Sequence, residues 1–340
     1  MKGIILHGGH GTRLRPLTHT GPKQLLKIAN KPMSQYALED LKNIGITDIA
    51  IIIGDVYPEK VKEYYGDGTQ FGVDITYVFQ DEPKGIAHAI GLCKNFVGDD
   101  DFVVYLGDNI LRQSLEKHAK KFQESSNSAF ILLAEVPDPT KFGVVKLDGK
   151  KILEIVEKPK VPPSNYAVIG VYFLNPSFFE IIEKLTPSWR NELEITEALQ
   201  LFMKFGGTIN YDFVTGWWKD TGTPEDIIDA NRLILDNLVL ENQIKNFLET
   251  DISNLKLIQP VIIGKNCQID KTVTIGPYVS IGNNVTLKNC SISNSIIMDN
   301  CRITSSTKIT DSIIADNTTI EDANDKKSIF LLGERSNLKL

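Results

Sequence analysis

The sequence predicts a chain of two parts, an α/β domain with a mostly parallel mixed sheet and a second domain built as a left-handed parallel β-helix. Up to about residue 235, apolar runs alternate with segments of helical periodicity, which is typical of a sheet with helices on both faces. From about residue 257, apolar residues recur every six positions, a period typical of left-handed β-helices. A long helical segment at 223–249 lies between the two regions and predicts the connection.

The α/β domain is predicted to begin with a buried strand at Gly3–Leu6, which runs directly into a glycine-rich turn. Further buried strands are expected at four short apolar runs: Ile49–Ile53, Ile75–Phe79, Phe102–Leu106 and Ala129–Ala134. Helices are expected at four segments with helical periodicity: Met33–Asn43, Glu59–Tyr65, Ala87–Asn95 and Ser114–Gln123. Ligands bind such sheets at the carboxyl ends of the strands, where we expect the turns Gly8–Arg15 and Gly107–Asn109.

The segment at 223–249 carries the signals of a helix start. Thr223 is a favourable N-cap residue, Pro224 suits the first helical position, and Asp226 completes a pattern like a capping box. We therefore expect four parts along the chain: the α/β domain over 1–235, a helical connector over 236–256, the β-helix over 257–325 and a C-terminal tail over 326–340.

The β-helix prediction rests on two apolar rows. The first row begins with Ile263, Ile269, Ile275, Ile281 and Leu287 and continues to Ile320 with some five-residue steps. The second row lies two residues earlier and comprises Val261, Cys267, Val273, Val279 and Val285. Because three six-residue segments form one triangular coil, the pattern predicts about three to four coils. An antiparallel sheet, which would alternate with a period of two, is the alternative.

Composition excludes several classes of protein. A formal net charge of −6 over 340 residues argues against general binding to nucleic acid or to an anionic membrane. No apolar run approaches the roughly 20 residues needed to cross a bilayer, and the short N-terminal apolar stretch lacks the form of a signal peptide. The four cysteines, which contain no CxxC pair, are expected to be reduced thiols in a cytoplasmic protein: Cys93, Cys267, Cys290 and Cys301.

The turn after the first predicted strand is rich in glycine and positively charged. Residues 1–38 contain six lysines or arginines and no acidic residue. Glycines let backbone N–H groups approach an anion closely and nearby cations neutralise it, so the turn Gly8–Pro16 predicts a polyphosphate site. Leu14 occupies the place of the last glycine of the dinucleotide-binding pattern GxGxxG, and the P-loop pattern GxxxxGK[ST] does not fit either. A Rossmann dinucleotide site and a P-loop are therefore both excluded at this turn. A tight turn with a solvated basic face is the alternative.

A set of motifs in a fixed order resembles the signature of the sugar-1-phosphate nucleotidylyltransferases. The motifs are Gly8–Pro16, Pro22–Leu26, Leu106–Asn109, Phe142–Val145, Glu157–Pro159, Ser164–Val168, Glu192–Thr196 and Trp218–Thr223. The resemblance covers essentially the whole chain and is closest to the thymidylyl branch with a β-helix tail. It implies a Rossmann-like nucleotidyltransferase domain and a magnesium-dependent reaction of dTTP with α-D-glucose 1-phosphate that forms dTDP-glucose and pyrophosphate. Use of UTP or of an N-acetylhexosamine 1-phosphate is the alternative within the family.

The resemblance also implies roles for individual residues. Asp108 and Asp220 would hold Mg²⁺, which prefers hard oxygen ligands, and Arg13 and Lys23 would hold the triphosphate. Together with Lys158, these four residues form the implied catalytic set. The implied nucleotide site comprises Leu6, Gly8, Gly9, Gly11, Thr12, Arg13, Gln80 and Gly85. The implied sugar phosphate site comprises Gly143, Glu157, Lys158, Val168, Arg190, Glu194 and Trp218.

Rival interpretations come from other classes of protein. A regulatory subunit that binds nucleotide sugars without catalysis should have lost a metal ligand or a phosphate-binding cation, and this chain retains both kinds of residue. A glycosyltransferase would transfer sugar without pyrophosphate chemistry. A β-helix acyltransferase is disfavoured because no histidine follows His118, so the β-helix is expected to stabilise the fold and to contact other subunits of a homo-oligomer.

Phe142 stands where the family usually has Tyr, and His7 and His10 replace smaller residues.

Overall fold

The computed structural model describes residues 1–125, 128–243, 255–321 and 327–339. Contacts divide the chain into two compact units, Met1–Gly9 with Ser34–Trp218 and His10–Met33 with Lys219–Leu340. The predicted fold class, an α/β domain followed by a parallel β-helix, is confirmed. The expected boundary at residue 235 differs from this division, because the segment His10–Met33 makes its contacts within the unit that carries the β-helix.

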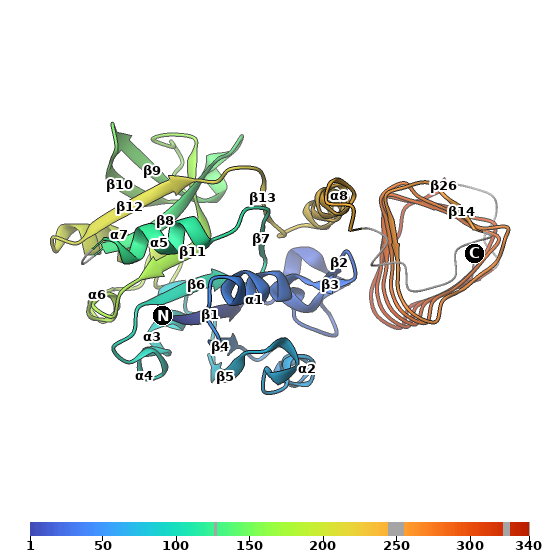
Figure 1. Ribbon diagram of the computed structural model, residues 1–340, viewed down its shortest axis with the longest axis horizontal. Helices are drawn as coiled ribbons and strands as arrows, with labels where there is room; N and C mark the ends of the chain where they lie inside the picture. The colour runs from blue at the N-terminus through green and yellow to red at the C-terminus, as the bar shows by residue number, and fades with distance from the viewer. Residues whose placement is uncertain (126–127, 244–254, 322–326, 340) are drawn as a thin grey trace. The chain divides into compact units, whose positions relative to one another are not determined.

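A nine-stranded mixed sheet forms the centre of the first unit (Figure 1). Seven strands run in the order β10-β9-β11-β6-β1-β4-β5, and β8 pairs with both β11 and β12. Strand β1 is parallel to β4 and β6, β4 to β5, and β8 to β12, whereas β11 is antiparallel to β6, β8 and β9, and β10 to β9. The strands are β1 Lys2–His7, β4 Asp48–Ile53, β5 Asp74–Phe79, β6 Phe102–Leu106, β8 Ser128–Glu135, β9 Gly143–Asp148, β10 Lys151–Glu157, β11 Tyr166–Leu174 and β12 Thr208–Phe213.

The strands expected from apolar runs are present as β1, β4, β5, β6 and β8. The expectation of burial is wrong for β5, which lies at an edge of the sheet and has no buried residue. Strands β9, β10, β11 and β12 lie outside the runs expected as strands. Several residues of β10 and β12 are exposed and their sequences lack a continuous apolar run, whereas the apolar run of β11 is almost entirely buried and carries a signal that could have located it. A separate two-stranded sheet pairs β7 (Asn109–Leu111) with β13 (Trp218–Asp220). The mixed sheet thus combines a parallel core, which the sequence pattern predicts, with an antiparallel part that it does not reveal.

Helices flank this sheet at the four expected segments and also at two segments that were not expected, α6 and α7. They are α1 Met33–Asn43, α2 Pro58–Tyr65, α3 Ile86–Gly91, α4 Lys94–Val97, α5 Glu116–Gln123, α6 Phe178–Ile182 and α7 Ile195–Lys204, with 3-10 turns η3 Thr69–Phe71 and η4 Pro139–Lys141. The single helix expected at Ala87–Asn95 is divided into α3 and α4, and the break follows Gly91, a weak helix former. No helix in the described part of the chain is long and apolar enough to cross a bilayer.

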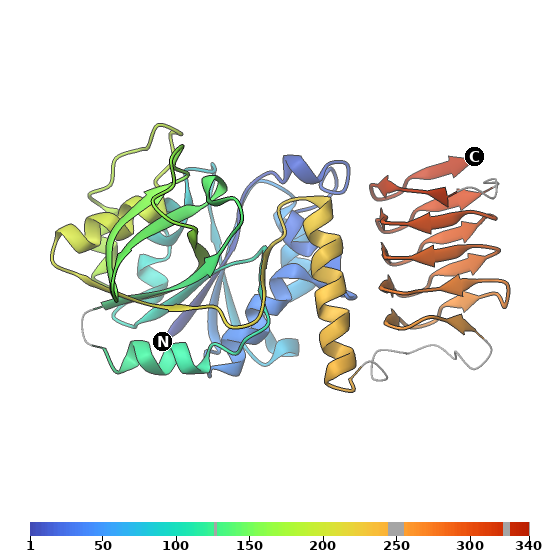
Figure 2. The same ribbon diagram turned by 90° about the horizontal axis from the view of Figure 1, so that it is seen from above.

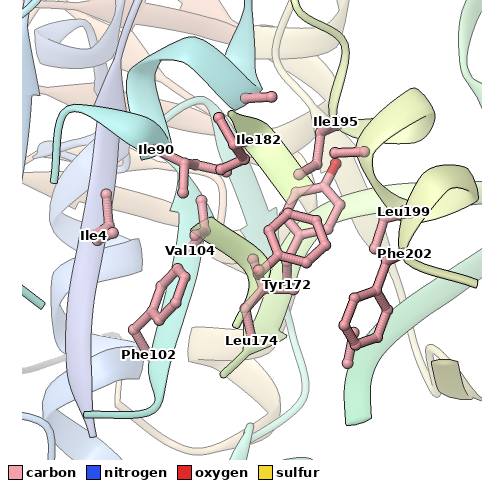
Figure 3. Close-up of a cluster of buried hydrophobic side chains, with 14 of the residues drawn as sticks. Ile4, Ile90, Phe102, Val104, Tyr172, Leu174, Ile182, Ile195, Leu199 and Phe202 are labelled. Atoms are coloured by element: carbon pink, nitrogen blue, oxygen red, sulfur yellow. The ribbon is translucent and has the colours of Figure 1, made fainter. Parts of the chain in front are cut away.

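One face of the sheet packs against α3, α6 and α7. Ile4 and Val104, from the neighbouring strands β1 and β6, lie in one buried cluster with Ile90 of α3 and Ile182 of α6 (Figure 3). Burial of each such side chain contributes about 1.5–3 kcal/mol. This packing fixes the positions of β1 and β6, whose carboxyl ends carry the glycine turn and Asp108.

The second unit contains a long helix, α8, which covers Pro224–Leu240. Its predicted start is confirmed, because the Thr223 side chain accepts a hydrogen bond from the backbone N–H of Asp226 at 3.3 Å. Residues 244–249 of the expected helix lie outside the described residues, as does most of the expected connector. The helix therefore begins where predicted but ends at Leu240, and the expected continuation is wrong at 241–243, which are not helical.

The segment His10–Met33 joins α8 and the β-helix in the second unit. It contains two 3-10 turns, η1 (Thr12–Leu14) and η2 (Lys23–Leu25). A short antiparallel hairpin follows, formed by β2 (Lys27–Ile28) and β3 (Lys31–Pro32). Arg13 and Lys23, which the sequence assigns to the triphosphate, therefore lie in these two 3-10 turns.

The β-helix consists of three parallel sheets of five strands each. Figure 1 shows its triangular cross-section and Figure 2 shows the strands stacked coil upon coil. Both predicted apolar rows point into one buried cluster. The first sheet is β14 Lys256–Leu257, β17 Thr274–Ile275, β20 Ser291–Ser293, β23 Lys308–Thr310 and β26 Lys327–Ser328. The second is β15 Val261–Ile263, β18 Val279–Ile281, β21 Ser295–Ile297, β24 Ile313–Ile314 and β27 Leu331–Leu332. The third is β16 Gln268–Ile269, β19 Thr286–Lys288, β22 Arg302–Thr304, β25 Thr319–Glu321 and β28 Asn337–Lys339.

The β-helix is longer than the sequence analysis expected. Strands β26, β27 and β28 pair with β23, β24 and β25, so the expected tail at 326–340 and the estimate of three to four coils were wrong. Ser328 pairs with Ile309 and interrupts the apolar row with a polar residue, which hid the fifth coil in the sequence pattern. Leu332 and Leu338 resume the rows beside Ile314 and Ile320.

Candidate active site

Asp108 lies in the turn after β6, where the sequence analysis placed it. One of its carboxylate oxygens, Oδ1, accepts a hydrogen bond from Asn109 Nδ2 at 3.0 Å. The backbone N–H of Gly107 donates to the carbonyl oxygen of Leu6 at 3.0 Å, which ties this turn to the end of β1. The half-buried carboxylate is thus held at the carboxyl end of a central strand, where ligands bind α/β sheets.

The side chain of Asn109 connects Asp108 to two other parts of the first unit. Asn109 is buried, and its Oδ1 accepts hydrogen bonds from Trp218 Nε1 at 2.7 Å and from Gly170 N at 3.1 Å. A Cβ atom at Gly170 would lie 2.8 Å from Asn109 Oδ1, so glycine is needed for this close approach. Because both ends of its amide are engaged, Asn109 has a fixed orientation and in turn orients Asp108.

Replacement of Asn109 with alanine is expected to reduce both stability and activity. The variant leaves Trp218 Nε1 and the Gly170 N–H without their acceptor, and an unpaired buried polar group costs about 1–3 kcal/mol. Loss of about 1.4 kcal/mol of transition-state stabilisation would lower kcat/KM tenfold. Denaturant unfolding and steady-state kinetics measure the two effects, with Asn95→Ala on the exposed side of α4 as the control. A folded Asn109→Ala enzyme with normal kcat/KM would contradict the positioning role.

Gln80 follows β5, and its amide nitrogen has two partners. Nε2 lies 3.4 Å from the carbonyl oxygen of Gly85 and 2.9 Å from His88 Nδ1. Since a carbonyl oxygen only accepts, the nitrogen side of the buried amide faces Gly85, which leaves Oε1 as an acceptor for a ligand. Burial, together with the charge of Lys84, lowers the pKa of His88, which favours the neutral ring that can accept through Nδ1.

Gly85 itself is required by the backbone. Its φ is 100°, in the region that favours glycine, and a Cβ atom there would lie 2.4 Å from the carbonyl oxygen of Leu193. The backbone N–H of Leu193 donates to Lys84 O at 2.8 Å, and that of Ala87 donates to Leu193 O at 3.0 Å. The loop after Gln80 is therefore held against the segment that leads into α7.

Glu157, the last residue of β10, is the centre of a polar group on the sugar side of the expected site. Thr196 Oγ1 donates to its Oε2 at 3.0 Å, and Lys158 Nζ and Arg190 Nη1 lie 3.5 and 3.6 Å from its Oε1. A Cβ atom at Gly143 would lie 2.3 Å from Thr196 Cγ2 and 3.4 Å from Glu157 Oε2. Any side chain at position 143 would therefore displace Thr196 from the carboxylate.

Arg190 is surrounded by carboxylates. Its Nη1 lies 3.2 Å from Glu194 Oε1 and its Nη2 lies 3.0 Å from Glu192 Oε1, in addition to the contact with Glu157. Burial and the charge of Glu157 raise the pKa of the Glu194 carboxyl, which also accepts a hydrogen bond from Ser188 Oγ at 3.0 Å. The charge of Arg190 is thus balanced within the protein, and Lys158 is the more exposed cation of this group.

The part of the glycine turn that belongs to the second unit, from His10 onward, presents Arg13. Gly11 has a φ of 58°, which favours glycine, and its carbonyl oxygen accepts a hydrogen bond from Thr18 Oγ1 at 2.8 Å. Arg13 is exposed, and a Cβ atom at Gly222 would lie 2.9 Å from its Nη2. The guanidinium group therefore rests against Gly222, and the lack of a side chain at position 222 makes room for it.

Lys23 and Asp220 belong to the same unit as Arg13. Lys23 begins η2, and its Cβ would lie 3.3 Å from a Cβ atom at Gly11, which places the two turns side by side. Asp220 ends β13, and the next residue, the buried Thr221, donates through Oγ1 to Met33 Sδ at 2.7 Å. Among the described residues, no group of three or more His, Cys, Asp or Glu side chains is arranged to hold a metal.

His7, which departs from the family pattern, is buried at the end of β1. Neither of its ring nitrogens has a hydrogen-bond partner within the described part of the chain, and its ring packs edge-on against Tyr65 with centroids 5.9 Å apart. Burial lowers the pKa of His7 to about 3, against the opposing effect of Asp108. The imidazole is therefore neutral at pH 7 and adds no positive charge to the glycine turn.

Comparison with known proteins identifies the family. The family described as nucleotidyl transferase matches residues 2–237, more than half of the chain. The chain belongs to the nucleotidyl transferase family. A second family, described as the GMPPB C-terminal domain, matches residues 257–339, which form the β-helix. The resemblance to sugar-1-phosphate nucleotidylyltransferases and the enzyme class that it implied are confirmed.

Relatives of this nucleotidyltransferase cover most of its length. The low-salt glycan biosynthesis nucleotidyltransferase Agl11 of Haloferax volcanii is 50% identical over 244 residues, 72% of this chain and 68% of that protein. A glucose-1-phosphate thymidylyltransferase of Streptomyces antibioticus is 41% identical over 300 residues, 84% of this chain and 83% of that protein. A crystal structure of a candidate glucose-1-phosphate thymidylyltransferase from Bacillus anthracis, in complex with a sucrose, is 45% identical with a TM-score of 0.66, and the match covers 68% of this chain and 94% of that one.

The structure brings the predicted site residues together in groups within each unit. In the first unit, Asp108 is linked to Trp218 by hydrogen bonds through Asn109, and Gln80 contacts Gly85. A third group surrounds Glu157 and comprises Gly143, Glu157, Lys158, Arg190 and Glu194. Leu6 and Val168 are buried in the core beneath them. No role for Asn109, His88, Thr196 or Gly222 follows from the sequence, although Asn109, Thr196 and Gly222 lie inside the quoted motifs. The expected cytoplasmic location and homo-oligomeric state stay predictions.

Proposed function

We propose that this nucleotidyltransferase forms dTDP-glucose and pyrophosphate from dTTP and α-D-glucose 1-phosphate. The observation that carries the proposal is the complete motif set in a chain that is 41% identical to a glucose-1-phosphate thymidylyltransferase over 84% of its length. The polar groups around Gln80, Asp108 and Glu157 then have the chemistry to read a base, a metal-bound phosphate and a sugar, respectively.

The base side of the proposal rests on the orientation of Gln80. Because Nε2 is engaged by Gly85 and His88, Oε1 is available to accept the N3–H group that thymine and uracil share and that cytosine lacks. A relative from Haloferax volcanii named UTP--glucose-1-phosphate uridylyltransferase is 36% identical over 235 residues, which supports UTP as the alternative substrate. The amide of Gln80 thus selects this pair of bases, and the thymidylyl assignment comes from the motif set.

The proposed reaction joins two anions. A phosphate oxygen of glucose 1-phosphate attacks the α-phosphorus of dTTP, a new P–O bond forms there, and the bond to the leaving pyrophosphate breaks. The attacking oxygen is already ionised at neutral pH, so no side-chain nucleophile or base is required. Neutralisation of charge and alignment of the reactants supply most of the catalysis, and we assign Arg13 and Lys23 to the triphosphate and Lys158 with Arg190 to the sugar phosphate.

Members of this family generally use a divalent metal ion. We propose Asp108 and Asp220 as the ligands of Mg²⁺, because carboxylates are the hard oxygen donors that it prefers, and Asp108 lies in the turn after β6 while Asp220 ends β13. The ion would offset the negative charge of phosphoryl oxygens when it is bound. Asn109 contributes by holding Asp108 Oδ1 in place.

The sugar is assigned to the group around Glu157. Thr196 and the neighbouring cations hold the carboxylate oxygens of Glu157, which suits them to accept hydrogen bonds from sugar hydroxyls. Trp218 is half-buried, packs with its ring centroid 5.5 Å from that of Phe142, and donates to Asn109. Its indole is thereby fixed as one wall of the proposed sugar pocket.

A matrix of substrates tests the proposed function. Purified protein is incubated with Mg²⁺ and each pairing of dTTP or UTP with glucose 1-phosphate or N-acetylglucosamine 1-phosphate, and released pyrophosphate is measured. We expect the highest kcat/KM for dTTP with glucose 1-phosphate and no turnover after chelation of the metal. A higher value for UTP would assign the alternative substrate, and an absence of pyrophosphate with every pair would contradict the proposed reaction.

A further inference from the structure

We propose that the β-helix and α8 hold the triphosphate-binding segment, residues 11–25, in its working conformation, so that residues of the β-helix act as positioning residues for the reaction. The inference rests on the proposed function for its kinetic consequence and on contacts within the second unit for its geometry. Two separate contacts are involved, one inside the segment at Pro16 and one just after it at Lys27–Asn30. We call them the hairpin clamp, formed by Lys27–Asn30 with Asn231, Ile281 and Asp299, and the glycine contact, formed by Gly333 with Pro16.

The tip of the β2–β3 hairpin has an unusual backbone. Ala29 and Asn30 have φ values of 49° and 63°, as the tight two-residue turns that suit hairpins require at both central positions. Alanine rarely adopts this conformation, because its Cβ atom crowds the backbone. A tip of this kind is held by contacts from outside the hairpin, and Asn30 supplies one by donating through Nδ2 to the carbonyl oxygen of Ile281 at 2.6 Å.

A second contact of the hairpin clamp passes through one oxygen atom of α8. Asn231 is 1% exposed, and its Oδ1 accepts hydrogen bonds from the backbone N–H of Ala29 at 2.9 Å and from Ser280 Oγ at 2.6 Å. Ser280 lies in β18 of the β-helix and is fully buried. The hairpin tip, the helix and the β-helix therefore meet at Asn231.

The third contact of the hairpin clamp is an ion pair. Lys27 Nζ lies 2.5 Å from Asp299 Oδ2, and each side chain is about one-fifth exposed. The other oxygen of Asp299 accepts the backbone N–H of Asn283 at 2.9 Å, and the Asp299 N–H donates to Asp316 Oδ1 at 2.8 Å. Because the coil corners of the β-helix hold this carboxylate, it provides a fixed anchor for Lys27, four residues after Lys23.

The glycine contact lies within the segment, at Pro16. A Cβ atom at Gly333 would lie 2.9 Å from the carbonyl oxygen of Pro16, so the backbone of the fifth coil approaches the chain three residues after Arg13. Gly333 is buried, and its φ is not in the region reserved for glycine. Alanine at this position would change the space beside Pro16 without straining its own backbone.

These contacts give the β-helix a part in the reaction. Arg13 lies three residues before the glycine contact, Lys23 lies between Pro16 and the hairpin clamp, and alignment of bound groups within about an ångström is worth up to two orders of magnitude in rate. The expected consequence is specific to the nucleotide. Weakening either contact should raise the KM for dTTP and leave the KM for glucose 1-phosphate unchanged, because the residues around Glu157 that we assign to the sugar phosphate lie in the first unit.

Three variants of the full-length protein test the inference: Lys27→Met, Asn231→Leu and Gly333→Ala. We expect each to raise the KM for dTTP about tenfold. Asp299→Asn keeps the acceptor for Asn283 and should have the same effect as Lys27→Met. The double variant Lys27→Met with Asp299→Asn should raise the KM for dTTP no further than either single variant does. Arg302→Met is the matched control, because its 3.8 Å pair with Glu321 joins two strands of the β-helix itself.

Hydrogen exchange supplies a readout that does not depend on the substrate. In the three variants, backbone amides of residues 11–26 should exchange at least tenfold faster than in the wild type, while those of β1, β4 and β6 keep their protection. Unchanged exchange in residues 11–26, or equal increases in the KM values of both substrates, would overturn the inference. If the wild type is inactive with dTTP but the variants show the faster exchange, the proposed function is contradicted and the positioning contacts are not.

Discussion

Asp108→Asn is expected to reduce kcat/KM by a hundredfold or more. The substitution keeps the size of the side chain and its contact with Asn109, so the fold should persist. It removes the negative charge of the carboxylate that we propose as a Mg²⁺ ligand. Removal of one preorganised electrostatic group costs roughly a hundredfold to a thousandfold in rate. Initial rates of pyrophosphate release across a series of Mg²⁺ concentrations measure the effect, and the variant should also need more metal for half-maximal activity.

The control for this prediction lies at the opposite end of the same strand. Asp99 is exposed in the turn that precedes β6, so Asp99→Asn removes the same charge from the same part of the sequence without approaching the carboxyl end. It should leave kcat/KM within about twofold, since surface substitutions have small effects. If Asp108→Asn were as active as Asp99→Asn, Asp108 would not be a metal ligand.

Arg13→Ala is expected to be the other severe variant, with a loss of about a hundredfold in kcat/KM. Arg13 is exposed in the glycine turn and its guanidinium lies against Gly222, so its removal costs little stability but takes a phosphate-binding cation from the site. Gly222→Ala offers a graded version, because its Cβ atom would meet Nη2 at 2.9 Å and displace the guanidinium. We expect this variant to lose about tenfold with Arg13 still present.

The two variants at this position separate charge from placement. The KM for dTTP should rise in both, and Arg13→Ala combined with Gly222→Ala should be no worse than Arg13→Ala alone, because the glycine acts through the arginine. Arg302→Ala, which removes an exposed arginine from the β-helix, is the control for loss of charge. Additive losses in the double variant would show that Gly222 has a role independent of Arg13.

Much of the fold could be predicted because burial leaves a regular mark on sequence. The six-residue rows of the β-helix and the apolar runs of β1, β4 and β6 are buried on every side, so each position is constrained and the period is visible. Where polar residues interrupt a row, as Ser328 does in the fifth coil, the pattern fails even though the backbone pairing continues. Strands such as β10, with several exposed residues, carry too weak a pattern to be located.

The candidate site was predictable in its residue types and less so in its supporting contacts. Charged residues in motifs pointed to phosphate and metal chemistry, but Asn109 owes its role to Trp218 and Gly170, which are more than 60 residues away along the chain. The same holds for His88 beside Gln80, whose significance lies in the orientation of one amide. Contacts of this kind are set by the tertiary fold, and a single sequence does not reveal them.

A crystal structure with dTDP-glucose and Mn²⁺ in place of Mg²⁺ would test the central claim most directly. The account predicts an anomalous peak from a metal ion coordinated by carboxylate oxygens of both Asp108 and Asp220. The diphosphate should contact Arg13 or Lys23, and the N3–H group of the base should donate to Gln80 Oε1. A metal bound elsewhere, or a product that leaves the glycine turn vacant, would contradict it.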